Sequence, residues 1–290
     1  MHPDDTTAVP AEDDEVLDRV RAAAALLAGR RIAVLTGAGI STDSGIPAYR
    51  GAGARPRATP MTIQTYLGDA GARRRYWLGG HLGWRAFTSP DPNAGHLALA
   101  RLERTGAVTG VVTQNVDGLH LRAGSTRVVE LHGTMHRVLC LRCGQVLDRR
   151  AVAEQLEKLN PWVRIPERIA LNPDGDVTPE STRGFVIPPC TVCAGMLKPE
   201  VVFFGEFVPA ARFRAAESLV GASDALLVAG TSLTVNSGIR IIERARRRGI
   251  PLVIVNREPT RADAWADAVI AGGTSSVLSA LADRLDRVEA

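Results

Sequence analysis

A chain of 290 residues is long enough for one large α/β domain and a small additional module. Hydrophobic residues make up 45% of the chain, which is ordinary for a globular protein, and its longest apolar runs are far too short to cross a bilayer. The net charge of +4 is mild, and the basic cluster at 244–248 is explained as the solvated end of a helix, so nucleic-acid binding is not indicated.

Residues 1–15 are acidic and lack an apolar core, unlike a signal peptide or an arginine-rich transit peptide. We expect this stretch to be a disordered tail and the protein to be cytosolic. Cysteines stay reduced in the cytosol, so the four cysteines are not expected to form disulfides.

Six short apolar segments alternate with helical patterns along the chain. They end in small or polar residues, as strands buried on both faces of a parallel sheet do. The predicted strands are 32–36, 108–113, 128–131, 225–229, 252–255 and 268–271. The predicted helices are 16–28, 73–87, 96–104, 210–220, 237–248 and 276–288. This alternation predicts a doubly wound, Rossmann-like α/β domain with a parallel sheet.

Two stretches interrupt the alternation. One, 51–92, is rich in Gly, Pro and Arg and shows a helix but no strand, and the other, 140–199, has paired cysteines at both ends. The expected division is a tail over 1–15, a Rossmann-like domain over 16–50, 93–135 and 201–290, a helical or cofactor-loop insertion over 51–92, and a zinc-binding module over 136–200.

The first predicted strand runs into a glycine-rich turn, Gly37-Ala38-Gly39-Ile40-Ser41. Such a turn lets backbone N–H groups approach a phosphate, although it is also compatible with a simple strand-to-helix turn. Thr42 replaces the third small residue of a dehydrogenase fingerprint, and no acidic residue follows about twenty residues later. Dinucleotide binding therefore remains plausible, whereas hydride transfer is disfavoured.

Polar residues follow the next two predicted strands. Gln114 and Asn115 can bond ribose hydroxyls or an amide, and Asp117 can accept from a carboxamide, unless these residues only cap a turn. His132 follows the third strand and reaches the same sheet edge, where an imidazole titrating near neutrality suits proton abstraction. Later strands add Gly230-Thr231-Ser232, suited to phosphate, and Asn256-Arg257-Glu258, suited to a ribose.

Two C-x-x-C knuckles contain every cysteine of the chain: Cys140 with Cys143, and Cys190 with Cys193. Two such hairpins can supply four thiolates to a tetrahedral Zn²⁺. A closed site of this kind leaves no open position for substrate, so we expect a structural zinc.

Taken together, these residues resemble the sirtuin family of NAD-dependent protein deacylases from about residue 27 to 285. The motifs that carry the resemblance are 37–41, 44–47 with Tyr49 and Arg50, 113–117, 131–133, the four cysteines, 197–199, 201–206 and 230–232. The chain is most similar to the class II branch, because the cysteine pairs are widely separated and because of Tyr49, 75–77 and 172–177.

The resemblance implies transfer of the acyl group from a protein lysine to ADP-ribose, with release of nicotinamide. His132 would be the base and Asn115 a second catalytic residue. The implied NAD-binding residues are Gly37, Ala38, Gly39, Ile40, Ser41, Ile46, Tyr49, Arg50, Gln114, Asn115, Val116, Asp117, Gly230, Thr231, Ser232, Asn256, Arg257, Glu258 and Thr274. The implied substrate-binding residues are Val202, Phe203, Phe204, Gly205, Glu206, Leu233 and Val235, which would pair with an acylated peptide as an added strand.

Two positions depart from the family pattern. Ala48 stands where aspartate is usual, beside the loop that would cover nicotinamide. Gly80 and Gly83 align with the Tyr-x-x-Arg pair that binds succinyl-type acids in another branch, so we expect apolar acyl chains to be preferred over acetyl, and acetyl over succinyl.

Two alternatives of different kinds remain open. A mono-ADP-ribosyltransferase would share the NAD site but use a protein side chain as the nucleophile. A zinc-ribbon adaptor for nucleic acid would need aromatic residues among basic ones, and the segment between the knuckles offers mainly Trp162 and Phe185. We therefore expect acylated-lysine proteins as partners, and neither nucleic acid nor a membrane.

Overall fold

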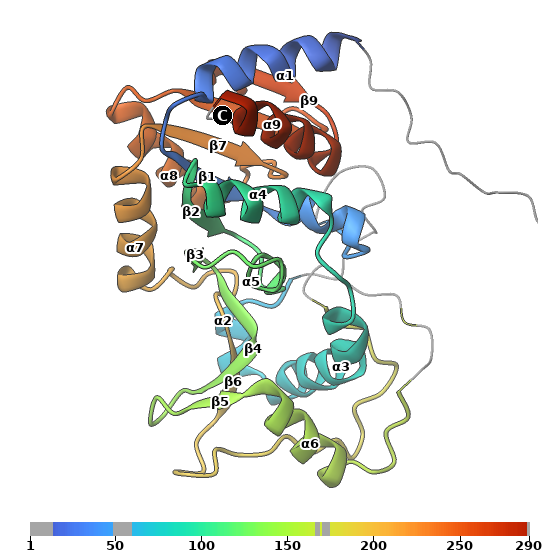
Figure 1. Cartoon of the computed structure of the whole chain (residues 1–290). Helices are drawn as coiled ribbons and strands as arrows, with labels where there is room; N and C mark the ends of the chain where they lie inside the picture. Colours follow the sequence, from blue (N-terminus) through green and yellow to red (C-terminus); the bar gives the residue numbers. More distant parts are fainter. Residues whose placement is uncertain (1–13, 49–59, 166–168, 170–174, 289–290) are drawn as a thin grey trace, which may run out of the picture.

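A parallel six-stranded sheet forms the centre of the larger part of the molecule (Figure 1). The computed structural model describes residues 14–48, 60–165, 169 and 175–288. The strands are β1 (Ile32–Thr36), β2 (Val108–Thr113), β3 (Val128–Glu130), β7 (Ala225–Ala229), β8 (Leu252–Asn256) and β9 (Ala268–Ala271). Their order, β3-β2-β1-β7-β8-β9, is that of a doubly wound Rossmann-like fold, which confirms the predicted fold class.

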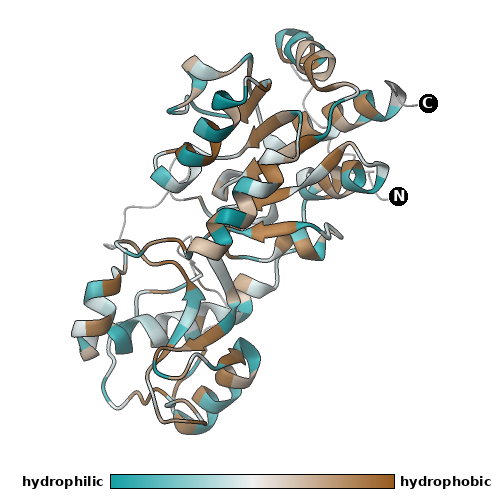
Figure 2. Cartoon of the chain, turned by 90° about the vertical axis from the view of Figure 1, so that its left-hand side faces the viewer, coloured by the Kyte–Doolittle hydropathy of each residue, from teal (hydrophilic) through white to brown (hydrophobic). Residues whose placement is uncertain are grey.

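Helices cover both faces of this sheet because alternate strand residues point to opposite sides. In β1, Ile32 and Val34 pack into one apolar cluster, while Ala33 and Leu35 pack into another. The first cluster is closed by α1 (Asp14–Leu27), α4 (Ala94–Thr105) and α9 (Thr274–Val288), and the second by α7 (Ala210–Gly221) and α8 (Asn236–Arg247). Figure 2 shows the hydrophobic strands lying between these helices.

The predicted elements of this sheet and its helices are confirmed, with boundaries that shift by one or two residues. The strand expected over 252–255 extends to Asn256, which pairs with Ala271. The strand expected over 128–131 ends at Glu130, although the Leu131 N–H still donates to the Thr113 carbonyl at 2.8 Å.

The smaller part contains a second sheet that the sequence did not reveal. Strands β4 (Gly133–Cys140), β5 (Val146–Asp148) and β6 (Leu197–Val201) are antiparallel, in the order β5-β4-β6, and α6 (Arg149–Leu159) follows β5. Strand β4 mixes apolar residues with His136 and Arg137, so it lacks a clear strand pattern. Because Gly133 already pairs with Val201, the small sheet begins before the boundary expected at 136.

The segment expected as a helical insertion packs against this small sheet. It contains α2 (Ile63–Gly68) and α3 (Ala70–Thr88), and Asp69 caps α3 by accepting from the N–H groups of Gly71 and Ala72. One apolar cluster joins Tyr66 and Trp77 of these helices to residues of β4, α6 and β6. An isolated parallel bridge also joins Thr62 to Phe204, so the insertion is not free of strand pairing. In the described part of the chain, none of the helices has the length and apolar character needed to cross a membrane.

Candidate functional site

The candidate site lies where the strand order of the large sheet reverses. Strands β1 and β7 are parallel neighbours there, and their following connections lead to opposite sides of the sheet. Ligands of open α/β sheets bind at the carboxyl ends of strands at such a switch point. The turn after β1 begins at Gly37, and the turn after β7 begins at Gly230, so the two glycine-containing motifs meet at this edge.

The glycines of the first turn permit a close approach between these two turns. A Cβ on Gly39 would lie 2.8 Å from the Gly230 carbonyl oxygen, and one on Gly37 would lie 2.6 Å from the Thr231 Cβ. The Gly39 N–H donates to the Gly230 carbonyl at 2.8 Å, and the Gly37 and Ile40 N–H groups also donate to protein carbonyls. The sequence suggested that N–H groups of this turn would be free to bind a phosphate. These three already donate to protein carbonyls, so they are not free donors. Instead, the glycines bring the hydroxyl-bearing turn at Thr231 and Ser232 against η1 (Ala38–Ser44).

Ser41, Asn115 and Asp117 form a buried polar network at this edge. The Asn115 amide nitrogen donates to the Ser41 hydroxyl at 3.0 Å, and that hydroxyl donates to Asp117 Oδ2 at 2.7 Å. Asp117 Oδ1 accepts from the Leu119 N–H at 2.9 Å. All three side chains are at most 9% exposed. The network holds an amide and a carboxylate in a fixed relative orientation, which suits recognition of a carboxamide.

Two buried histidines, His96 and His120, lie beneath this network, and neither was predicted from the sequence. His120 Nε2 lies 2.9 Å from the Thr36 hydroxyl, and the His96 ring contacts the His120 ring with centroids 4.8 Å apart. Burial lowers the pKa of His120 well below its usual value and lowers the pKa of His96 to about 4. Both rings are therefore neutral at pH 7. Asn93, which caps α4 in a capping box with His96, was the local signal for this cluster.

His132 reaches the same edge with both ring nitrogens engaged. Nδ1 lies 3.0 Å from the Gln114 carbonyl oxygen, and Nε2 lies 2.8 Å from the Ser237 hydroxyl. A carbonyl only accepts, so Nδ1 carries the proton and Nε2 presents a lone pair. Burial lowers the pKa of His132, and the bond to Gln114 opposes that shift. Nε2 is thus available as a base at neutral pH. Ser237, at the start of α8, was not among the predicted residues.

The remaining predicted cofactor residues lie around this edge with individual partners. Gln114 Oε1 accepts from the Thr231 hydroxyl at 2.7 Å, which links the turns after β2 and β7. The Asn256 amide donates to the Glu258 carbonyl at 2.6 Å, and Arg257 pairs with Asp43 of η1 at 3.1 Å. The Thr274 hydroxyl donates to the Gly39 carbonyl at 3.4 Å, whereas Ile46 and Val116 join the apolar cluster of the smaller part. Tyr49 and Arg50 lie outside the described residues.

The predicted substrate segment, 202–206, leaves β6 directly beside His132. The Val202 N–H donates to the His132 carbonyl at 2.8 Å, and the Phe204 carbonyl accepts from the Ile63 N–H at 3.0 Å. Glu206 folds back onto this segment, accepting from the Phe203 N–H at 2.9 Å. Phe204 and Val235 are 43% and 41% exposed, whereas Leu233 is buried. An extended peptide could therefore contact exposed apolar side chains on both sides of this region.

Lys198 is a buried cation that was not among the predicted site residues. Its ammonium group lies 3.1 Å from Glu206 Oε2 and 4.5 Å from the centroid of the Phe203 ring. It also donates to the Val201 carbonyl. The lysine is 3% exposed, so its pairing with Glu206 holds the substrate segment against the end of β6.

The four cysteines meet as predicted. Cys140 and Cys193 have their sulfurs 3.5 Å apart, those of Cys143 and Cys190 are 3.8 Å apart, and all four lie within 4.8 Å of one another. A tetrahedral Zn²⁺ with bonds of about 2.3 Å requires sulfurs about 3.8 Å apart. The cluster fits that ion, and four thiolates leave no coordination position for a substrate.

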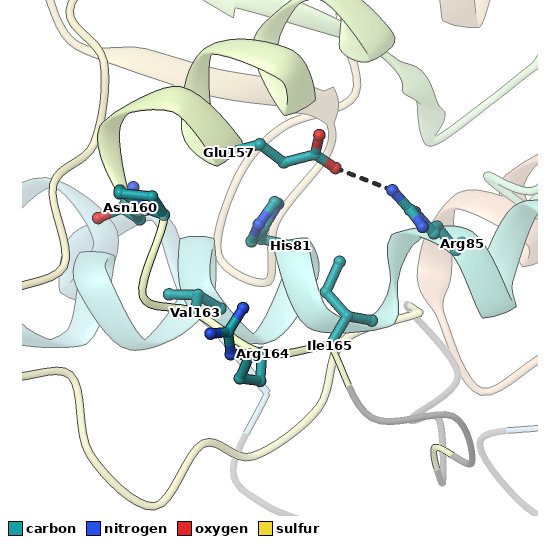
Figure 3. A pocket seen from close by; sticks show the side chains of 8 residues that line it. His81, Arg85, Glu157, Asn160, Val163, Arg164 and Ile165 are labelled. Atoms are coloured by element: carbon teal, nitrogen blue, oxygen red, sulfur yellow. Dashed lines mark hydrogen bonds and ion pairs between the residues drawn. The ribbon is translucent and has the colours of Figure 1, made fainter.

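A separate pocket of about 270 Å³ lies between α3 and α6 (Figure 3). The figure shows His81 inside it, with Arg85 paired to Glu157 at 3.2 Å. None of the predicted site residues lines it; the lining residues are His81, Arg85, Glu157, Asn160, Pro161, Val163, Arg164 and Ile165. The pocket is thus distinct from the sheet-edge site.

Comparison with known proteins identifies the family. Residues 37–237 match the Sir2 family. The NAD-dependent protein deacetylase 1 of Mycobacterium avium is 54% identical over 265 residues, covering 90% of this chain and 94% of that protein. The NAD-dependent protein lipoamidase sirtuin-4, mitochondrial, of Bos taurus is 47% identical, with coverage of 81% and 76%. A solved Sir2 complex with a p53 peptide and NAD⁺ is 29% identical, with a TM-score of 0.71 and coverage of 92% and 96%. The chain therefore belongs to the Sir2 family.

Proposed function

We propose that this chain is an NAD-dependent protein-lysine deacylase. The reaction moves the acyl group from a lysine side chain to ADP-ribose and releases nicotinamide. The observation that carries the proposal is the meeting of two features at one sheet edge. The Ser41–Asn115–Asp117 network follows β1 and β2, beside the switch point, and the Nε2 lone pair of His132 follows the neighbouring strand β3.

The cofactor roles follow the position of each group along that edge. The turns 37–41 and 230–232 would hold the pyrophosphate, with the Ser232 hydroxyl as a donor, because the Thr231 hydroxyl already donates to Gln114. Residues 256–258 and Thr274 would lie toward the adenosine end, where Arg257 is fixed by Asp43. Asn115 and Asp117 would orient the nicotinamide carboxamide, because both are already held in register by Ser41.

His132 would remove a proton from a ribose hydroxyl once nicotinamide has left. The Gln114 carbonyl keeps the proton on Nδ1, so Nε2 is the accepting atom. The Ser237 hydroxyl now bonded to Nε2 would exchange for the ribose hydroxyl. The acylated peptide would lie between segments 202–206 and 233–236, with its lysine directed toward His132.

Zinc would stabilise the smaller part of the fold and would take no part in the reaction. Cys140 and Cys190 both belong to the apolar cluster that also contains Trp77 and Phe203. Metal binding would therefore fix the framework on which the substrate segment rests.

Within the family, we propose membership of the class II branch. The wide separation of the cysteine pairs and Arg75-Tyr76-Trp77 in α3 support it, as does the similarity to sirtuin-4. Tyr49 and residues 172–174, which the sequence also suggested as branch markers, lie outside the described residues. The cytosolic location suggested by residues 1–15 stays a prediction.

The test is nicotinamide release by the purified protein from NAD⁺ in the presence and absence of acyl-lysine peptides. Release that depends on acyl-lysine, with free lysine as product, supports the proposal. The alternative is a mono-ADP-ribosyltransferase, and labelled ADP-ribose appearing on protein without any acyl-lysine would favour it. His132→Ala serves as the control, because it removes the proposed base and leaves the carboxamide network intact.

A further inference from the structure

The pocket between α3 and α6 is formed by one face of a helix and by the loop that follows another. His81 and Arg85 are four residues apart on α3, so they project from the same face of that helix. Figure 3 shows the loop after α6 bringing Val163, Arg164 and Ile165 beside them. The volume of about 270 Å³ lies below the lower limit of about 300 Å³ for pockets that hold drug-sized ligands. The pocket therefore suits a small molecule.

The imidazole of His81 is buried in the wall of this pocket and lacks a hydrogen-bond partner. His81 is 3% exposed, and its ring forms no hydrogen bond with any described residue. Nδ1 is inaccessible to solvent, so Nε2 is the ring nitrogen that an occupant of the pocket could reach. Buried polar groups in proteins are nearly always hydrogen-bonded. Since His81 lines a pocket, a ligand is the natural candidate for the missing partner.

His81 would meet such a ligand as a neutral donor. Burial lowers the pKa of His81 below its ordinary value of 6.5, and the nearby charge of Arg149 lowers it further. The ring is therefore uncharged at pH 7 and carries a single proton. With that proton on Nε2, the imidazole can donate to an oxygen atom inside the pocket.

The lining of the pocket carries one positive charge that its own residues do not compensate. Arg85 and Glu157 form an ion pair at 3.2 Å and neutralise each other (Figure 3). Arg164 is exposed and pairs with no carboxylate within the described part of the chain. Because His81 is neutral, two arginines against one glutamate leave a net charge of +1. This charge favours an occupant with a single negative charge.

The rest of the lining is either held in place or apolar. The buried Asn160 amide nitrogen donates to the carbonyls of Leu156 and Val186 at 2.9 Å, and its oxygen accepts from the Val186 N–H at 2.7 Å. Asn160 therefore fixes the end of α6 and offers no free group to an occupant. Three further lining residues are apolar: Pro161, Val163 and Ile165. An occupant of matching chemistry has an apolar body beside its charged group.

We propose that this pocket binds a small monocarboxylic acid, with its carboxylate between His81 and Arg164. One carboxylate oxygen would accept from the imidazole Nε2–H, and the guanidinium would donate to the same planar group, a geometry that arginine favours. The apolar body would lie against Val163 and Ile165. A phosphate dianion would exceed the charge that the lining balances, and a divalent cation would face two arginines while Glu157 is already paired.

The bound acid would be an effector, because α3 also contacts the candidate substrate segment. Tyr76 lies roughly 140° around the helix axis from His81, and its ring packs against the Phe203 ring at 5.1 Å. An acid that joins α3 to the loop after α6 would hold α3 in the position in which this contact is made. We therefore expect the acid to lower KM for the acyl peptide, a consequence that rests on the deacylase function proposed above.

The binding test uses ligand-observed NMR of 4-methylpentanoate with the zinc-loaded full chain, and 4-methylpentanamide as the uncharged analogue of the same shape. We expect a dissociation constant of about 1 mM for the acid, as suits so small a ligand, and at least about fivefold weaker binding of the amide. Arg164→Gln and His81→Phe should each weaken binding of the acid at least about threefold. Arg150→Gln removes an exposed arginine of α6 outside the pocket and should leave binding unchanged.

Both pocket variants should fold, because Arg164 is exposed and the His81 ring has no hydrogen bond to a described residue that phenylalanine would remove. Equal binding of acid and amide, or binding that both variants leave unaltered, would overturn the site.

The effector role is tested by the kinetics of an acetyl-lysine peptide. Saturating acid should lower KM about twofold or more in the wild type, and Arg164→Gln should lose this effect at the same concentration. Acid that binds without changing KM would overturn the coupling through α3. If no acyl peptide releases nicotinamide, with or without the acid, the deacylase function itself is contradicted, and the binding measurements still decide on the pocket.

Discussion

Nε2 of His132 lies 2.8 Å from the hydroxyl of Ser237, although the two residues are 105 positions apart in the chain. On the other side of the ring, Nδ1 lies 3.0 Å from the backbone carbonyl of Gln114. The carbonyl belongs to the main chain of the turn after β2, so it cannot be lost by substitution. The orientation and the tautomer of the imidazole are therefore set by the fold, and Ser237 only occupies the reactive nitrogen until a substrate arrives.

His132→Ala and Ser237→Ala should differ strongly in activity for this reason. Loss of the base should lower kcat by at least about 100-fold, the usual size of a general-base contribution, with NAD⁺ binding retained. Ser237→Ala should lower kcat by less than about tenfold, because Gln114 still orients the ring. Steady-state kinetics measures kcat of the two variants, and calorimetric titration measures their NAD⁺ binding. Equal losses in the two variants would mean that Ser237 relays the proton.

The pH dependence of kcat/KM follows from the environment of His132. Burial lowers its pKa from the ordinary value of 6.5, and the neutral form is the base. As the pH falls, activity should therefore persist through 6.5 and decline only as the pH passes the lowered pKa. Above 6.5 the rate should be flat with respect to this group. An acid limb centred above 6.5 would show that the imidazole is not the titrating base or is not buried when substrate binds.

The fold of the large sheet was predictable because its strands are buried on both faces. All five residues of β1 and of β7 are fully buried, and every one of them except Thr36 is apolar. The small sheet has no such signal. Residues of β5 are partly or fully exposed, and β4 contains His136 and Arg137, since these strands bury only one side against α3 and α6. The cysteine cluster beside them joins Cys140 and Cys143 to Cys190 and Cys193, which lie far apart in the chain.

The site was predictable where function demands a recognisable motif at a strand end. Asn115, Asp117 and His132 follow directly on strands, and their convergence at one edge was expected. Ser237 and Lys198 were missed because each acts across the fold, one from the start of a helix and the other from within a strand. The glycines of 37–41 were recognised from the sequence, but as a turn that opens backbone N–H groups to a phosphate. In the structure they allow close contact with Gly230, which no local sequence pattern reveals.

Zinc removal should unfold the smaller part first. Cys140 and Cys190 are buried in the same cluster as Trp77, so the metal and the apolar core depend on each other. The purified protein should contain one Zn²⁺ per chain, and Cys140→Ser should lose both zinc and activity. Metal analysis, together with tryptophan fluorescence during chelation, tests this. Full activity in zinc-free protein would contradict it.

Lys198→Met should weaken peptide binding and leave NAD⁺ binding unchanged. The ammonium group is buried and holds Glu206, whose carboxylate in turn accepts from the Phe203 N–H. Without the lysine, segment 202–206 loses its anchor to β6, and the free energy of unfolding should fall by about 2 kcal/mol, less than for a fully buried pair because Glu206 is partly solvated. The expected result is a raised KM for the acyl peptide with an unchanged Kd for NAD⁺. An unchanged KM would show that the ion pair does not position the segment.

Two glycine-to-alanine substitutions should have opposite effects on stability. In Gly39→Ala the new Cβ would lie 2.8 Å from the Gly230 carbonyl oxygen and 2.9 Å from the Gly230 Cα, both backbone atoms that cannot move aside cheaply. Such overpacking costs roughly 1–3 kcal/mol. In Gly80→Ala the new Cβ would meet no atom within 4 Å, in the interior of a 19-residue helix. Alanine is favoured over glycine there by roughly 0.5–1 kcal/mol.

Urea unfolding of both variants and of the wild type, with zinc present, measures these two changes in stability. Gly39→Ala should shift the midpoint to lower urea, and it should also weaken NAD⁺ binding, because the turn after β1 must move away from Gly230. Gly80→Ala should shift the midpoint to higher urea and leave NAD⁺ binding as it is. A methyl group fills only part of the space beside Gly80, so turnover of acetyl-lysine should also be retained. A destabilised Gly80→Ala would mean that the space beside Gly80 is already occupied.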